Sequence, residues 1–212
     1  MKKFFAMIVA VIICATTTVC FAQSSGAMRL AILPISKDAD VSADLTLDKT
    51  KIATSKLYEG MENCGYFEIL ERERVDRIVQ EHELAASGLI DKSTAPIFGK
   101  MLGAEYILIS NITGLSSRRK TSSIAGMGNN NYVVTARCAA RIVEVETGRV
   151  VLAATSSASS ADKVPKIHSN GVVQIGTESV AQWLVDDALE KAADALVDKL
   201  MINLDRKKAA RR

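Results

Sequence analysis

The chain has 212 residues, of which 48% are hydrophobic and 24% are charged, with 12 Gly and 3 Pro. This composition excludes collagen, low-complexity disorder and a polytopic membrane protein, and it predicts one ordinary globular domain. The formal net charge is +3, and losing Lys2 and Lys3 with a targeting segment leaves +1. So small a charge gives no electrostatic footprint of a nucleic-acid-binding protein.

The first 22 residues have the pattern of a signal peptide. Lys2 and Lys3 precede an apolar run of 12 residues, Phe4 to Ala15, which is long enough for a signal and too short for a membrane-spanning helix. A small-x-small site ending at Ala22 follows, so we expect cleavage before Gln23 and export of the protein. The alternative is an anchor helix that stays on the chain.

Two of the four cysteines, Cys14 and Cys20, lie in this signal, and neither follows the small residue that a lipidation site needs. Cys64 and Cys138 remain in the mature chain. In an oxidising compartment they could form a disulfide, which would stabilise the fold by about 4 kcal/mol through the loop it closes. The alternative is two buried free thiols, since Cys64 lies at a predicted helix end and Cys138 on the apolar face of a predicted strand.

The first half of the mature chain alternates between strand and helix patterns. In order, we predict a strand at 28–35, a helix at 47–63, a strand at 66–70, a helix from Glu71 and a short helix that closes at Gly103. In the helix from Glu71, His82 falls on the same face as Val75 and Val79, so its position is explained by packing.

The second half predicts mainly strands and loops. In order, we predict a strand at 104–112, a loop at 114–131, a strand from Tyr132 with a bulge near Ile142, a Gly148 turn, a strand at 149–155, a loop at 156–176 and a helix at 178–204. Both loops are predicted because small and polar residues and glycines are frequent in them.

Together these elements predict a single α/β (α+β) domain with a mixed sheet of about five strands, helices packed on it and a long C-terminal helix. Its expected limits are a signal peptide at 1–22, a short linker at 23–27, the domain at 28–204 and a basic tail at 205–212. We expect the core to centre on five apolar residues of one strand and three helices. They are Ile107, Ile109, Leu57, Val79 and Leu196.

Motifs for catalysis, metals and cofactors are missing from the sequence. Its two histidines, His82 and His168, are far apart, and no Cys or His pair has metal-ligand spacing. No phosphate-binding glycine motif and no G-x-S-x-G nucleophile elbow occurs. The acidic cluster after Leu70 is better explained as a solvated helix start than as a carboxylate site. We therefore expect no cofactor, no metal and no enzymatic activity.

One basic triplet, Arg118, Arg119 and Lys120, lies in the first predicted loop. Three adjacent cations could contact anionic lipid headgroups or an acidic partner protein. The alternative is that they are simply solvated, as charges in loops usually are.

Short motifs follow one another between Leu70 and Gly114. They are Glu71-Arg72 at a helix start, Gln80-Glu81 near its end, Ser87-Gly88-Leu89-Ile90-Asp91, and Leu102-Gly103-Ala104-Glu105-Tyr106 before a strand. A later hairpin turns at Gly148. In these motifs the chain resembles the CsgG family of curli-secretion channel proteins, over most of 28–204.

The resemblance implies a periplasmic domain at the outer membrane, similar also to the lipoprotein activators of penicillin-binding proteins (LpoB type). It implies that the motif residues are structural. The channel-forming members are lipoproteins that assemble as rings and give β-hairpins to a shared channel. This chain departs from them, because it has no lipidation site and because segments 114–131 and 156–176 contain no aromatic residue for the membrane interface.

We therefore expect an exported, non-enzymatic cell-envelope protein that acts in assembly or secretion at the outer membrane through protein-protein contacts, without its own pore. The alternatives are a periplasmic regulator that docks on a peptidoglycan synthase and a true oligomeric secretion channel. Its expected partners are envelope proteins, with a homo-oligomer as a further option, and not nucleic acid. Its expected location is the periplasm, with outer-membrane association as a further option.

Overall fold

The structure is a computed structural model that describes residues 28–38, 41, 47–81, 95–124, 127–162, 172–175 and 178–210. The predicted signal peptide and linker lie outside the described residues. So do both histidines and three residues of the family motif, Ser87, Gly88 and Asp91.

Six strands of the described chain form one mixed sheet, in the spatial order β3-β1-β4-β5-β6, with β2 beside β4. Their bounds are β1 Met28–Ile32, β2 Ser36–Lys37, β3 Phe67–Ile69, β4 Tyr106–Ile124, β5 Met127–Glu144 and β6 Val150–Asp162. β1 pairs in parallel with β3 and β4, whereas β4, β5 and β6 form an antiparallel meander. β7 (Val172–Ile175) and β8 (Glu178–Ala181) form a separate two-stranded sheet.

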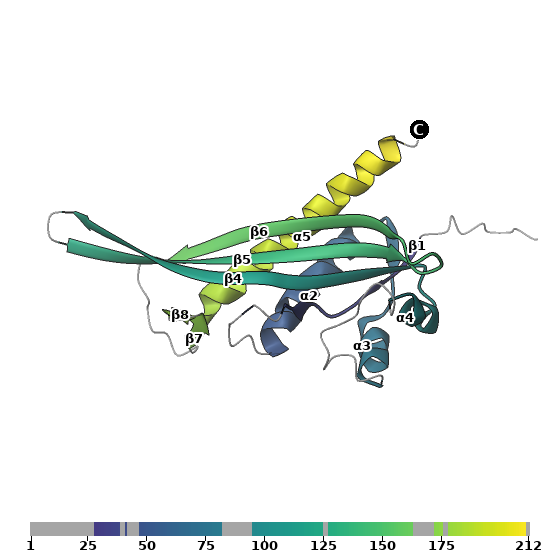
Figure 1. Cartoon of the computed structure of the whole chain (residues 1–212), viewed down its shortest axis with the longest axis horizontal. Helices are drawn as coiled ribbons and strands as arrows, with labels where there is room; N and C mark the ends of the chain where they lie inside the picture. The colour runs from purple at the N-terminus through teal and green to yellow at the C-terminus, as the bar shows by residue number, and fades with distance from the viewer. Residues whose placement is uncertain are drawn as a thin grey trace, which may run out of the picture.

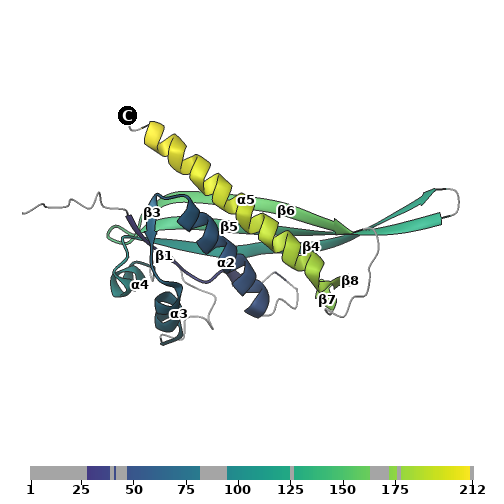
Figure 2. The ribbon, with the colours of Figure 1, turned by 180° about the vertical axis from the view of Figure 1, so that it is seen from behind.

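Helices cover both faces of the six-stranded sheet. α2 (Leu47–Asn63) and the long α5 (Gln182–Ala209) lie side by side on one face (Figure 2). α3 (Arg72–Glu81) and α4 (Ala95–Leu102) cover only the end of the other face where β4 begins (Figure 1). The predicted fold class, α/β (α+β) with a mixed sheet and a long C-terminal helix, is confirmed, with six strands rather than about five.

Two separate apolar clusters result, because successive residues of a strand point to opposite faces. Leu30 and Ile32 of β1 pack with α2 and α5, whereas Ala31 and Leu33 pack with α3 and α4. The prediction of one core that joins Ile107 and Val79 to Leu57 and Leu196 is wrong. The sheet separates the two pairs: Leu57 and Leu196 belong to the larger cluster, and Ile107 and Val79 to the smaller one. Ile109 is only partly buried, against the smaller cluster.

The two predicted loops are wrong in large part. β4 and β5 run through segment 114–131 except at residues 125 and 126, which are not described, and they pair with each other up to Ile124 and Met127. β6 continues to Asp162, and β7 lies in the second predicted loop. These strands are held by backbone hydrogen bonds, which residues such as Ser and Thr can form as well as apolar residues can. The sequence therefore lacks the alternation of apolar and polar residues by which a half-buried strand is recognised.

Two other boundaries differ from the predicted ones, and one detail agrees. The C-terminal helix begins at Gln182, because residues 178–181 form β8, and it continues through Ala209, so part of the predicted tail is helical. The predicted bulge near Ile142 is confirmed by a register shift between β5 and β6 at Ile142 and Val143.

Candidate interaction surface

The longest feature of the sheet is a hairpin extension that we call the arm, made of residues 114–124 of β4 and 127–137 of β5. It begins after a register shift between Ile112 and Gly114. β6 pairs with β5 only as far as Tyr132, so the tip of the arm extends beyond the rest of the sheet (Figure 1). At about 3.4 Å per residue, each strand of the arm is about 35 Å long.

Strand edges are the first property of the arm. β4 pairs with β1 through Leu108 and with β2 through Ile112, and beyond Ile112 no strand of the described chain pairs with that side of β4. Residues 127–131 of β5 likewise lie beyond the end of β6. The N–H and C=O groups along such an edge are a template for pairing with a strand of another chain.

An open sheet face is the second property. Ser116, Thr135 and Ser159 lie side by side on the face away from α5, where the hydroxyls of Thr135 and Ser159 are 2.7 Å apart. Arg118 and Arg137 are exposed on the same face. This part of the surface is therefore polar and positively charged, and it fits an acidic partner better than an apolar one.

The predicted basic contact residues lie on the arm but do not form one patch. Arg118 is opposite Val133 and Arg119 is opposite Tyr132, so their side chains point to opposite faces of the hairpin. Both are exposed, and the side chain of Lys120 lies outside the described residues. This division could not be predicted while the segment was expected to be a loop, in which neighbouring side chains share no fixed direction.

The structure has two free thiols at Cys64 and Cys138. The Sγ of Cys64 donates a hydrogen bond to the carbonyl of Met61, 2.8 Å away. Cys138 is 1% exposed, and burial raises the pKa of its thiol to about 12. Because the thiolate is the form that attacks a disulfide, Cys138 is a poor nucleophile at neutral pH.

The family-motif residues that the structure describes make local structural contacts. The carbonyl of Glu71 accepts the N–H of Val75 at the start of α3. Arg72 donates to the hydroxyl of Ser55, 2.8 Å away, and its guanidinium lies over the ring of Tyr58, which connects α3 to α2. Gly103 and Gly148 have φ of 69° and 67°, a conformation that other residues rarely adopt.

Tyr58 itself links α2 to the sheet. Its hydroxyl donates to the carbonyl of Ile32, 2.8 Å away, and burial raises the pKa of Tyr58 well above its ordinary value of 10, helped by the nearby Asp76 carboxylate. The hydroxyl therefore stays protonated and serves as a donor at neutral pH. This contact is structural.

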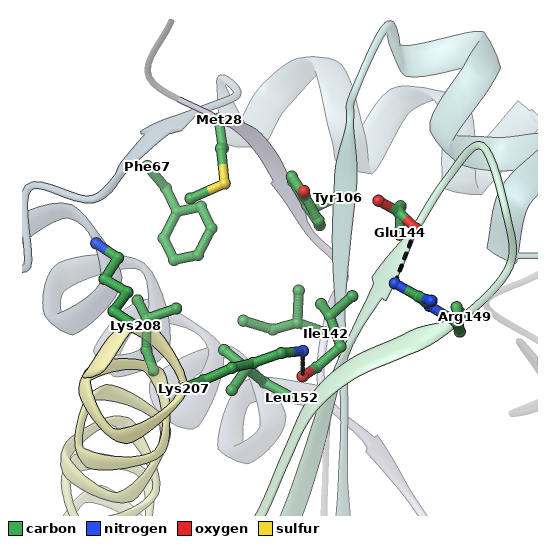
Figure 3. A pocket seen from close by; sticks show the side chains of 11 residues that line it. Met28, Phe67, Tyr106, Ile142, Glu144, Arg149, Leu152, Lys207 and Lys208 are labelled. Atoms are coloured by element: carbon green, nitrogen blue, oxygen red, sulfur yellow. Dashed lines mark hydrogen bonds and ion pairs between the residues drawn. The ribbon is translucent and has the colours of Figure 1, made fainter. Parts of the chain in front are cut away.

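A shallow hollow of about 140 Å³ lies at the end of the sheet opposite the arm (Figure 3). Apolar side chains form its floor: Met28, Phe67, Tyr106, Ile142, Val151, Leu152 and Leu204. Four charged side chains form its rim: Glu144, Arg149, Lys207 and Lys208. Lys208 is held over the ring of Tyr66, with Nζ 3.4 Å from the ring centre. No sequence pattern revealed this hollow, because its residues come from strands and a helix that are distant in the chain.

Metal sites and membrane-spanning helices are both absent from the described residues. These residues contain no group of three or more His, Cys, Asp or Glu side chains that could hold a metal ion. None of their helices combines the length and apolar composition that a bilayer crossing needs.

Comparison with known proteins identifies the family. The family model described as curli production assembly/transport component CsgG matches residues 19–212. The chain belongs to the CsgG family. The resemblance drawn from the sequence motifs is thereby confirmed, and membership places the chain among cell-envelope proteins. No curated protein matches the chain in sequence.

Several solved structures are similar to this chain. The hypothetical protein CT253 from Chlamydia trachomatis is 11% identical, with a TM-score of 0.49 over 84% of this chain and 96% of that chain. Lipoprotein GNA1162 from Neisseria meningitidis is 14% identical, with a TM-score of 0.46 over 68% of this chain and 88% of that chain. The LpoB C-terminal domain from Salmonella enterica is 17% identical, with a TM-score of 0.42 over 62% of this chain and 82% of that chain.

Proposed function

We propose that this CsgG-family protein is an exported, non-enzymatic cell-envelope protein that acts in assembly or secretion at the outer membrane. It does so through protein-protein contacts made by the arm, and it forms no pore of its own. The observation that carries the proposal is the arm itself, whose tip extends past the sheet. No strand of the described chain pairs with the outer edge of its β4 segment or with residues 127–131 of β5 on the side away from β4.

The edges of the arm supply affinity without an apolar patch. A strand from a partner that pairs with β4 beyond Ile112 would satisfy main-chain donors and acceptors that otherwise face water. Arg118 and Arg119 then add charge, one on each face of the hairpin, and they favour an acidic partner strand. The arm therefore suits recognition by backbone pairing, with arginines that fix the orientation of the partner.

The side chains of the arm argue against a membrane strand. Such a strand must present apolar residues at every second position to lipid. In β4, one face carries Leu115, Ser117 and Arg119, and the other carries Ser116 and Arg118, so neither series is apolar. Each Arg placed near the bilayer midplane would cost about 2–4 kcal/mol, which argues against pore formation.

A photo-crosslinking experiment in the native envelope tests the contact. A photoreactive residue replaces Ser116 in the arm, and the matched control replaces the exposed Glu146 in the turn at the opposite end of the sheet. We expect a discrete adduct from position 116 and none from position 146. Equal adducts from both positions, or none from position 116, would contradict the proposal. An adduct with a peptidoglycan synthase would favour the regulator instead.

Conductance measurements test the absence of a pore. Purified mature protein in a planar bilayer should give no single-channel steps. Reproducible steps that disappear when residues 117–130 are replaced by a Gly-Ser turn would establish a channel and overturn this part of the proposal.

N-terminal sequencing tests export. The mature protein purified from the envelope should begin at Gln23, within a residue. A chain that still begins at Met1, or one acylated on Cys20, would contradict the proposed processing.

A further inference from the structure

β6 is the last strand of the sheet, so one of its edges has no strand partner among the described residues. On that edge three side chains of α5 donate hydrogen bonds to backbone carbonyls. Lys207 Nζ bonds the carbonyl of Val151 (2.7 Å), Asn203 Nδ2 that of Ala153 (3.0 Å) and Lys199 Nζ that of Thr155 (2.7 Å). The three acceptors are alternate residues of the strand, which in an antiparallel ladder point to the same side.

The spacing of the donors matches the spacing of the acceptors. Four residues along a helix rise about 6 Å, and two residues along a strand rise about 6.8 Å. α5 runs opposite to β6, so the donors at 199, 203 and 207 meet the acceptors at 155, 153 and 151 in turn. This register requires donors at every fourth position of the helix.

Farther along β6, two buried serines of the strand donate hydrogen bonds to α5. The hydroxyl of Ser156 donates to the carbonyl of Ala192, 2.7 Å away, and the hydroxyl of Ser160 donates to the carboxylate of Asp187. These contacts hold α5 in place beside the strand. The long side chains at 199, 203 and 207 can therefore reach the edge from a fixed distance.

The bonded carbonyls are the acceptors that an added strand would use. A strand from another chain could pair with β6 here only by displacing the two ammonium groups and the amide, and it would bring its own main chain against two cations. The side chains of this part of β6 are uncharged, and those of Ala153, Ala154 and Thr155 are small, so they would not by themselves keep a second strand away. The hydrogen bonds from α5 supply the block.

We propose that Lys199, Asn203 and Lys207 form an edge guard that closes β6 to strand addition by a second copy of this chain. A second copy is the relevant occupant, because two identical edges can pair antiparallel about a two-fold axis without any further partner. Closing this edge leaves the β4 side of the arm for strand pairing. The inference goes beyond the proposed function and does not depend on it.

The test is a triple variant, Lys199→Ala, Asn203→Ala and Lys207→Ala, examined by sedimentation velocity over a concentration series. We expect its self-association to be at least about tenfold tighter than that of the natural chain. The control variant, Lys191→Ala with Arg206→Ala, removes the same number of positive charges from α5 and should sediment like the natural chain. Association of the control to the same extent would overturn the proposal, as would a triple variant that sediments like the natural chain.

Two further variants show whether the donated hydrogen bonds themselves form the guard. Lys199→Arg, Asn203→Gln and Lys207→Arg together keep all three donors and should not self-associate; association equal to that of the alanine triple variant would contradict the guard. If the alanine triple variant does not fold, Asn203→Ala with Lys207→Ala near the end of α5 is assayed in the same way. Repeating the series with residues 117–130 replaced by a Gly-Ser turn should leave the outcome unchanged, which separates this inference from the arm.

Discussion

The arm and the rest of the sheet with its four helices, which we call the body, share strands β4 and β5. The two regions are stabilised in different ways. In the body, where α2, α3, α4 and α5 cover the sheet, the β4 residues Ile107 and Leu108 are both fully buried, on opposite faces. In the arm, Ser116, Arg118 and Arg119 of that same strand are exposed. The body is therefore held by packing on two faces, and the base of the arm shares in this through the buried Val134 and Ala136. The tip of the arm beyond Tyr132 has only the backbone pairing of one hairpin. A single strand can thus serve stability at one end and recognition at the other.

The largest difference in stability between the two regions should appear when an aspartate is introduced into each. Replacing Ile107 by Asp buries an unpaired carboxylate in the smaller apolar cluster, and we expect loss of the folded state, a cost of roughly several kcal/mol. The matched substitution in the arm, Ser116→Asp, should leave the melting temperature nearly unchanged. Circular dichroism melting measures both. A soluble Ile107→Asp variant with natural melting would show that the body does not bury this position.

Replacing one glycine by alanine in each region should give a smaller difference in stability. At Gly99 in α4, a Cβ atom would lie 2.1 Å from Cγ2 of Val145, so Gly99→Ala should destabilise by about 1–3 kcal/mol despite the better helix propensity of alanine. At Gly114, where the arm begins, it would lie 3.6 Å from Cδ of Arg137, an ordinary contact. Urea unfolding should show a loss for Gly99→Ala alone. Similar values for the two variants would mean that the body tolerates overpacking as well as the arm does.

Near the boundary between the two regions, Asp187 should make the free energy of unfolding depend weakly on pH. Lys191 and the hydroxyl of Ser160 lower the pKa of Asp187 below its ordinary value of 3.8. The carboxylate therefore stabilises the fold above that ordinary value, and this contribution is lost as the pH falls through the lower, folded-state pKa. Because Asp187 is partly exposed, we expect Asp187→Asn to cost about 0.5 kcal/mol at neutral pH. The measurement is the difference in unfolding free energy between the natural chain and Asp187→Asn, at neutral pH and in acid. A difference that stayed the same in acid would contradict this assignment.

The smallest effect is expected from removing most of the arm. Replacing residues 117–130 by a Gly-Ser turn removes none of the described residues that form or pack against either apolar cluster. We expect the free energy of unfolding to stay within about 0.5 kcal/mol of the natural value. Chemical unfolding in urea checks this. A loss of several kcal/mol would show that the arm contributes to the stability of the body.

Burial decides how much of this molecule could be predicted from its sequence. The helix at 47–63 and the bulge at Ile142 were predicted correctly, because apolar periodicity and its change of phase are visible wherever one face is buried. The part of the arm at 114–131 leaves no such trace, since its pairing uses the main chain. Its serines and asparagines therefore looked like a loop.

The candidate surface was predicted only by composition. Arg118 and Arg119 were singled out as contact residues, but their separation onto opposite faces follows from strand geometry that the sequence did not reveal. The division of the core between two faces was missed for a similar reason. Ile107 and Leu57 both look like core residues, and only the position of the sheet between them shows that they pack apart.

The place of α5 in the chain has a consequence for folding. This last element supplies ten buried residues, and its Asp186 pairs with the buried Lys49 of α2, 137 positions earlier. Contacts across such a separation carry a large loop-closure cost and form late. A growing chain that lacks α5 has only α2 to cover the larger cluster, so we expect folding to wait until the C-terminal helix has been synthesised. Chains truncated before Gln182 should remain unfolded.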